Sequence, residues 1–238
     1  MITKSITTKI AAMMSLALML SGAAFAAEQD LPETTKDGLK LVKHTKARIV
    51  YMAPDADLTQ YTKVGILDAQ VAFKKNWQRD YNRDEISLER RVTDQDMDRI
   101  KKELSAEFTK VFTEEIEKAG HETSEVTGAE VLVIVPYIIN LDVTSVDTGR
   151  EMGMSRTYNA DPGSMTLYLE LYDSITSAKL GFVEDAEALR TGGSWQISNR
   201  VTNKADADRI LRKWANELVS HLGAVKADAA ASDSGGSD

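Results

Sequence analysis

The side chains best suited to chemistry in this sequence lie between Phe73 and Asp96, in the stretch FKKNWQRDYNRDEISLERRVTDQD. Its cations alternate with two aromatic residues, a pattern that can bind nucleic acid by charge and stacking. Four carboxylates neutralise much of this charge: Asp80, Asp84, Glu85 and Glu89. The stretch is therefore either a strand-to-helix connection packed over a sheet edge or a lip that binds a ligand or partner. The residues of the lip would be Trp77, Arg79, Tyr81, Asn82 and Arg83.

A second candidate surface is the long connection from Val143 to Gly163, VTSVDTGREMGMSRTYNADPG. Connections of this length between strands are unusual and are often functional. Methionine side chains adapt to varied partners, so a contact surface is one interpretation of this segment. Its binding residues would be Arg150, Met154, Arg156 and Tyr158. The alternative is that part of the segment extends the neighbouring strands.

Sequence patterns typical of nucleophilic catalysis are missing. GMSRT has Thr157 where the second glycine of a nucleophile elbow would stand, and the chain has no cysteine. Several carboxylates, including Glu170 and Asp185, lie on a predicted hairpin, where they form either a solvated sheet face or an acid–base pair for glycan chemistry. No catalytic residue is assigned. A hydrolase would need two of these carboxyl groups about 5–9.5 Å apart in one cleft.

Metal and cofactor signatures also fail. The calcium-like loop from Asp55 has Gln60 where glycine is needed and Ile66 where the bidentate glutamate belongs. The three histidines, His44, His121 and His221, are too scattered for a zinc site. No phosphate-binding lysine follows a glycine-rich loop. The sequence therefore predicts neither a metal nor a cofactor.

The N-terminus predicts export. Lys4 and Lys9 precede the apolar run Ile10–Leu20, and Ala24-Phe25-Ala26 fits a signal-peptidase site before Ala27. We expect a periplasmic or envelope-associated protein, without a lipid anchor on a lipobox cysteine because cysteine is absent. No apolar run after Leu20 is long enough to span a membrane. The formal net charge of −8 would repel nucleic acid and anionic lipid at long range, so nucleic acid is not an expected partner.

The elements expected to position these residues form one domain. Alternating apolar residues predict strands over 47–52, 62–73 and 164–173, the last with a return strand from Leu180. A continuous apolar run over 129–143 predicts a buried strand with a bulge or bend at Pro136. Apolar residues at three- and four-residue steps predict helices from Thr93 or Asp94 to about Ala119 and from Asn203 to Gly223.

This order predicts an α+β two-layer sandwich, with a mostly antiparallel sheet of about four to five strands and two long helices on one face. The domain covers residues 27–223, between the leader 1–26 and the low-complexity tail 224–238. The tail is too polar to order itself.

Four blocks carry a family resemblance, and they lie in order along the chain: TTKDGLKLVKHTKARIVYMAPDADLTQYTKV, VAFKKNWQRDYN, MTLYLELYDSITSAKL and NRVTNKADADRILRKWANEL. They resemble domain-of-unknown-function family 3313, bacterial envelope proteins many of which are predicted lipoproteins. The resemblance covers roughly residues 31–222 and implies no activity.

We expect a non-enzymatic module that binds an envelope protein or a small ligand. The alternatives are an envelope hydrolase with paired carboxylates and a component that self-assembles into a homo-oligomer. The topology, which is similar to small domains of other envelope lipoproteins, suggests the latter.

Overall fold

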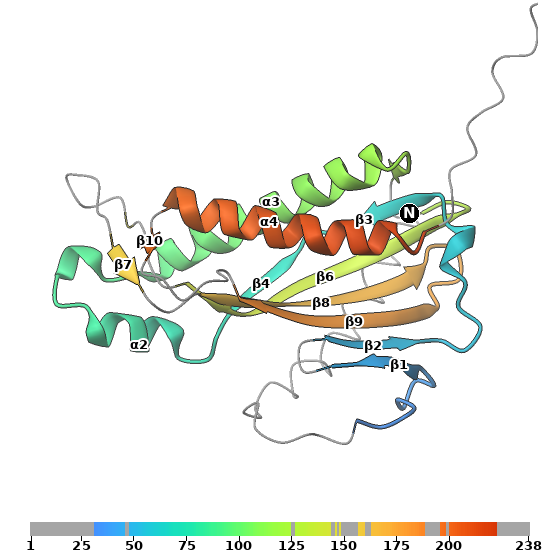
Figure 1. The fold of residues 1–238 in the computed structure, drawn as a ribbon, viewed down its shortest axis with the longest axis horizontal. Helices are drawn as coiled ribbons and strands as arrows, with labels where there is room; N and C mark the ends of the chain where they lie inside the picture. The colour runs from blue at the N-terminus through green and yellow to red at the C-terminus, as the bar shows by residue number, and fades with distance from the viewer. Residues whose placement is uncertain are drawn as a thin grey trace, which may run out of the picture.

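The computed structural model describes residues 31–45, 48–124, 127–143, 146, 148, 157–159, 163–188, 196–198 and 200–222. Over these residues, helices α3 and α4 lie side by side on one face of a mixed eight-stranded sheet, as Figure 1 shows. This arrangement confirms the predicted α+β class and the two helices on one face. The predicted leader 1–26 and tail 224–238 lie outside the described residues.

The elements have the following bounds. The strands are β1 (Lys40–His44), β2 (Arg48–Met52), β3 (Lys63–Ile66), β4 (Gln70–Phe73), β5 (Glu122–Ser124), β6 (Val131–Asp142), β7 (Thr157–Asn159), β8 (Ser164–Asp173), β9 (Lys179–Ala188) and β10 (Gln196–Ser198). The helices are α2 (Trp77–Asp84), α3 (Asp94–Lys118) and α4 (Arg200–Val219), with short 3-10 turns η1 (Leu58–Gln60) and η2 (Leu88–Arg90).

The prediction of four to five strands is wrong, because the sheet has eight. The strands follow the order β1-β2-β9-β8-β6-β3-β5, and β4 also pairs with β6. Strands β1, β2, β9, β8 and β6 pair antiparallel, whereas β3 and β4 run parallel to β6 and β5 runs parallel to β3. The parallel pairs need a long crossover, which the segment containing α3 supplies. Short strands such as β1 and β5 hold too few residues to show a clear alternation.

The predicted strand over 62–73 is two strands, and the break between them explains Pro136. The Leu67 N–H donates to the Ile134 carbonyl, so the backbone groups of Ile134 point toward β3 and β4. Backbone groups of a strand point the same way at every second residue, so those of Pro136 point to the same side. Pro136 has no N–H, and it lies opposite the gap between these two strands, where no ladder bond is lost. Pro136 itself stays in regular register with Leu169. The irregularity of β6 lies instead between Ile139 and Asp142.

The two long helices differ in how well local sequence marks their ends. The Thr93 hydroxyl accepts from the Asp96 N–H, and the Asp96 carboxylate accepts from the Thr93 N–H, a capping box that starts α3 as predicted. Gly120, with φ of 90°, follows the end of the helix. Helix α4 begins at Arg200, whereas the sequence predicted a start at Asn203. The prediction began too late because the β-branched Val201 and Thr202 do not favour a helix.

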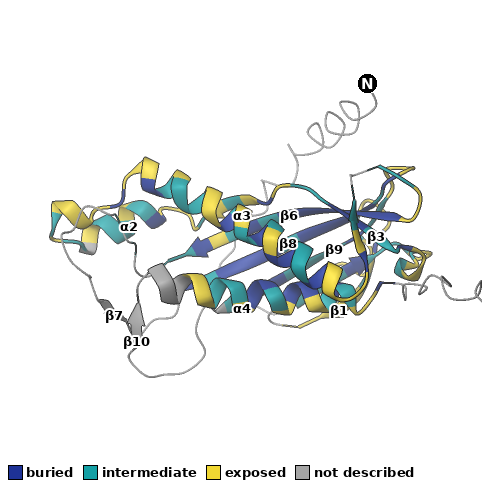
Figure 2. Cartoon of the chain, turned by 90° about the horizontal axis from the view of Figure 1, so that it is seen from above, coloured by how far each residue is buried: buried dark blue, intermediate teal, exposed yellow. Residues whose placement is uncertain are grey.

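The main core lies between the helices and the sheet. Phe108 and Phe112 of α3 are fully buried, with ring centroids 3.9 Å apart. They pack in one apolar cluster with Ile210 and Leu211 of α4 and with the inward residues of β6 and β8. Figure 2 shows the buried residues along the strands beneath the two helices, with exposed residues on the outer helix surfaces. This core makes α3, α4 and the sheet a firm base for the elements at its end.

Candidate binding surface

An arm projects from one end of the sheet and contains the first predicted lip. We call residues 74–91, which include α2 and η2, the α2 arm; Figure 1 shows α2 beyond the ends of α3 and α4. Trp77 anchors its base, because its indole is only 5% exposed and stacks on Phe73 at the end of β4, with centroids 4.4 Å apart. The Tyr81 ring also contacts Trp77, with centroids 5.3 Å apart. The Phe73–Trp77 stack therefore fastens the arm to the sheet.

Amide side chains on α2 then bind the chain that returns to α3. The Asn82 side chain donates to the Val92 carbonyl at 2.8 Å and accepts from the Val92 N–H at 2.7 Å. Gln78 donates to the Asp94 carboxylate at 2.9 Å. These bonds satisfy both backbone groups of Val92, which is buried. They hold the two legs of the arm together below its tip.

The structure brings the first predicted surface next to the start of the second. The Tyr81 hydroxyl accepts from the Val146 N–H at 3.1 Å, and the Thr148 hydroxyl donates to the Glu89 carbonyl at 2.9 Å. Tyr158 lies in β7, which pairs antiparallel with β10, so part of the long connection does form strand. The other predicted residues of this segment lie outside the described residues: Arg150, Met154 and Arg156.

The tip of the arm exposes two large apolar side chains that the sequence interpretation passed over. Ile86 is 96% exposed and Leu88 is 74% exposed. On α2, the side chains of Arg79 and Arg83 are about two-thirds exposed, and both pair with Asp80. The sequence did offer a sign of this exposure. Ile86 and Leu88 are isolated among charged residues, so no neighbouring apolar residue of the same segment could bury them. Trp77, Tyr81 and Asn82 thus hold the arm, whereas Ile86 and Leu88 at its tip are exposed.

Sheet register separates Glu170 and Asp185, the two carboxylates named for the hydrolase hypothesis. Asp185 pairs with Leu167, whose side chain lies in the main core beneath the helices. Glu170 pairs with Val135, which belongs to a separate apolar cluster. Directly paired residues lie on the same face of a sheet, so Glu170 and Asp185 lie on opposite faces. They cannot act together on one substrate.

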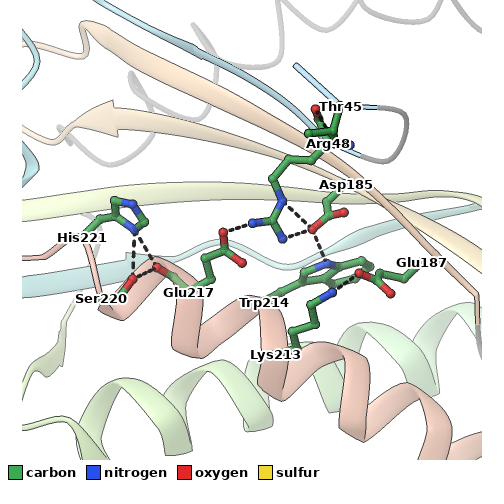
Figure 3. Close-up of polar contacts among 9 residues, drawn as sticks. All are labelled: Thr45, Arg48, Asp185, Glu187, Lys213, Trp214, Glu217, Ser220 and His221. Carbon is green, nitrogen blue, oxygen red and sulfur yellow. Dashed lines mark hydrogen bonds and ion pairs between the residues drawn. The ribbon is translucent and has the colours of Figure 1, made fainter. Parts of the chain in front are cut away.

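Asp185 instead joins α4 to the sheet, as Figure 3 shows. Its carboxylate is 2% exposed and accepts from the Arg48 Nε at 2.9 Å and from the Trp214 indole N–H at 3.1 Å. The Arg48 guanidinium also pairs with Glu217, and Lys213 pairs with Glu187 nearby. Charge-assisted bonds of this kind compensate for the burial of both ions. The cluster therefore links β2 and β9 of the sheet to α4.

Glu170 also has hydrogen-bond partners within the chain, on the sheet face away from the helices. Its carboxylate accepts from Tyr172 at 3.0 Å and from the Lys179 ammonium at 2.5 Å. Burial, with the Glu170 charge second, raises the pKa of both Tyr168 and Tyr172 far above the ordinary value. Both phenols therefore stay protonated and available as donors. This arrangement buries a carboxylate among donors, which suits structure more than proton transfer.

Glu184 on the same face gives a pH-dependent prediction. Burial raises the pKa of its carboxyl. The native state therefore holds this proton to higher pH than the unfolded chain, so the stability that the neutral carboxyl contributes falls as pH rises through that window. Glu184→Gln should raise the free energy of unfolding at pH 7, and with it the melting temperature, by less than about 1 kcal/mol because the group is partly exposed.

Thermal melts across pH check this prediction. The gain should vanish below about pH 4, where the carboxyl is neutral in both states. Glu33→Gln is the control, because Glu33 is exposed. An equal gain for both variants, or a gain for Glu184→Gln that persists at acid pH, would contradict the assignment.

In the part of the chain that the structure describes, His, Asp and Glu side chains nowhere gather in a group of three that could hold a metal ion. None of the helices described has the length and apolar character needed to cross a membrane.

Comparison with known proteins identifies a family. The model of DUF3313, "Protein of unknown function (DUF3313)", matches residues 33–218, which confirms the resemblance seen in the sequence. No curated protein matches the chain.

The similar solved structures are distant. The PelC dodecamer from Paraburkholderia phytofirmans is 8% identical, with a TM-score of 0.37 over 75% of this chain and 99% of PelC. A DUF330 protein from Xanthomonas campestris is 13% identical, with a TM-score of 0.36 over 71% of this chain and 86% of its own. A putative neuraminyllactose-binding hemagglutinin homolog from Helicobacter pylori is 13% identical, with a TM-score of 0.30 over 70% of this chain and 80% of its own. The dodecameric assembly and the neuraminyllactose binding named for these proteins are properties of those proteins.

Proposed function

Because this chain belongs to the DUF3313 family, whose function is unknown, we propose its role from its own surface. The protein is an exported, envelope-associated binding module without catalytic activity, and it contacts its partner through the tip of the α2 arm. The observation that carries this proposal is the exposure of Ile86 and Leu88 on a segment whose base is fixed by Trp77 and Asn82. Export rests on the leader sequence and the small-x-small site before Ala27.

The firm base of the arm supports binding because a pre-ordered contact surface loses little entropy on association. An exposed isoleucine or leucine costs the free protein solvation free energy that a partner recovers when it covers the side chain. Single exposed apolar residues are common on protein surfaces. Two within three residues, at the tip of a projecting element, are better explained by a contact.

Site-specific photocrosslinking in cells tests the proposal. A photoreactive amino acid at position 86 should give an adduct with a partner, whereas the same group at position 175 should give none. Ile175 is a matched control, since it is 67% exposed and lies in the β8–β9 turn, at the other end of the sheet from the arm (Figure 1). An adduct with a second copy would mean that the arm supports self-assembly.

The contact assigned to the arm is wrong if position 86 gives no adduct of any kind, or if positions 86 and 175 give the same adducts. Secretion of both proteins must first be verified by loss of the leader, measured by mass spectrometry. Retention of the leader would overturn the export part of the proposal separately.

A further inference from the structure

We propose that the sheet face away from α3 and α4 carries a binding site for a linear aliphatic amine, with the ammonium group paired with Glu184 and the carbon chain lying over Tyr168. This site is separate from the tip of the α2 arm and takes a ligand of a different kind. Three features of the face support it: a row of aromatic rings, a carboxylate that no described residue pairs with, and a lysine that already binds in the same manner beside it.

Aromatic side chains cross this face from strand to strand, and Figure 1 shows both long helices on the other side of these strands. Tyr137 of β6, Tyr168 of β8 and Phe182 of β9 follow one another with ring centroids 6.0 and 5.2 Å apart. Tyr51 of β2 continues the row, 5.0 Å from Phe182, but it is buried and its hydroxyl donates to the Pro32 carbonyl. The other three rings are only partly buried, so the accessible part of the row lies over β6, β8 and β9.

Glu184 lies at one end of this accessible part. Tyr168 pairs with Tyr137 on one side and with Glu184 on the other, so the three side chains share one face. The Glu184 carboxylate is partly buried, and among the described residues it has neither a hydrogen-bond donor nor an ion-pair partner. Its pKa is raised by burial alone. Burial of a carboxylate without a donor is unfavourable, and a ligand that brings the donor would remove this cost.

The same face already holds one ammonium group against a carboxylate and an aromatic ring. Lys179 Nζ lies 5.2 Å from the centroid of the Phe182 ring and 2.5 Å from the Glu170 carboxylate. Ring faces attract cations, and more strongly where water is excluded. Glu170 pairs with Phe182, and the next pair on this face is Tyr168 with Glu184, which has the carboxylate and the ring exchanged between β8 and β9. An ammonium from a ligand would bind there as Lys179 binds beside Glu170.

The polar groups at the two ends of the row define the class of ligand. Neighbouring strands lie about 4.8 Å apart, so the backbones of β6 and β9 at Tyr137 and Glu184 are separated by about 10 Å. A chain of methylene groups can cross Tyr168 between these ends and bury apolar surface on the ring. One amino group would pair with Glu184 and a second would reach the Tyr137 hydroxyl. The formal net charge of −8 also favours a cation over an anion.

The stability expected of Glu184→Gln agrees with a binding role for this carboxylate. The charged side chain lowers the stability of the free protein at neutral pH, because burial opposes its ionised form. Residues that lower stability are characteristic of sites where function needs them. A bound ammonium would favour the ionised carboxylate and offset the cost of its burial.

Isothermal titration calorimetry of the purified chain with cadaverine tests the site. Cadaverine is a linear diamine, and the diol of the same chain length is the uncharged comparison. Cadaverine should bind saturably at low salt and raise the melting temperature, whereas the diol should do neither. Glu184→Gln should weaken cadaverine binding at least about tenfold, because a hydrogen bond to a charged group is lost. Tyr168→Leu should weaken it about threefold to fivefold, since the ring face is lost.

Glu103→Gln is the matched control, since it removes the same charge from an exposed position on α3, across the sheet from the site, and should bind cadaverine as the unmodified protein does. Glu184→Gln should fold more stably than the unmodified protein, so a loss of binding in this variant would not reflect unfolding. Circular dichroism verifies the fold of Tyr168→Leu. Absence of saturable cadaverine binding would overturn the proposed site, as would equal losses in Glu184→Gln and Glu103→Gln, or equal binding of the diol.

Discussion

Asp185→Ala should lower the free energy of unfolding by about 3–5 kcal/mol, the loss usual when one partner of a buried ion pair is removed. The substitution leaves the Arg48 guanidinium, whose side chain is 13% exposed, paired with Glu217 and takes the acceptor from the Trp214 indole N–H. Urea denaturation followed by circular dichroism measures the effect. Because β2, β9 and α4 meet at this carboxylate, the loss should appear in the cooperative unfolding of the whole domain.

Two further variants separate the charge from the packing. Arg48→Met/Asp185→Leu should recover much of the loss, because apolar residues of similar volume often replace a buried ion pair without cost. Recovery should be incomplete, since the Trp214 N–H still lacks its acceptor, at about 1–3 kcal/mol. Glu122→Ala, which breaks the exposed pair with Lys63, should cost less than about 1 kcal/mol. A loss for Asp185→Ala no larger than that for Glu122→Ala would show that the cluster is not a structural junction.

Phe112→Ala should destabilise the domain by about 3–5 kcal/mol, as is typical for a large side chain removed from a close-packed core. Phe112 is fully buried, stacks on Phe108 and contacts the layer between the helices and the sheet. The substitution removes apolar surface and leaves a cavity that two helices and a sheet cannot easily close. The midpoint of urea unfolding should fall while the slope stays nearly constant.

Ile86→Ala is the control for Phe112→Ala. Both substitutions shorten a large apolar side chain, but Ile86 lies in water at the tip of the arm, so its replacement should change stability by less than about 0.5 kcal/mol. Similar effects at the two positions would contradict the described burial. The same result for Ile86→Ala would also show that loss of contact at the arm is not a folding defect.

Taken together, the contacts divide the polar clusters of this molecule into those that hold the fold and those that face outward. The Asp185 and Glu170 clusters are buried and bonded to named donors within the chain. The tip of the α2 arm exposes two large apolar side chains, Ile86 and Leu88, within three residues of each other near a fixed base. This division is why we place binding at the arm.

Local sequence determined the elements whose signals lie within them. Helix α3 was predicted to within a residue or two, because its capping box, its apolar period and Gly120 all fall in one stretch. The hairpin of β8 and β9 was predicted for the same kind of reason, since its alternation and its turn are contiguous. The family assignment also came from the sequence alone, through four blocks that occur in order.

Tertiary structure alone decided the rest. The faces on which Glu170 and Asp185 lie depend on the register across the hairpin, including an irregularity between Leu171 and Tyr172, which counting along the chain does not fix. The burial of Trp77 depends on Phe73 at the end of β4, and the exposure of Ile86 depends on the arm projecting beyond the sheet. The type and spacing of residues set which local structures and interactions are possible, whereas contacts between distant segments decide whether a given side chain is buried or exposed.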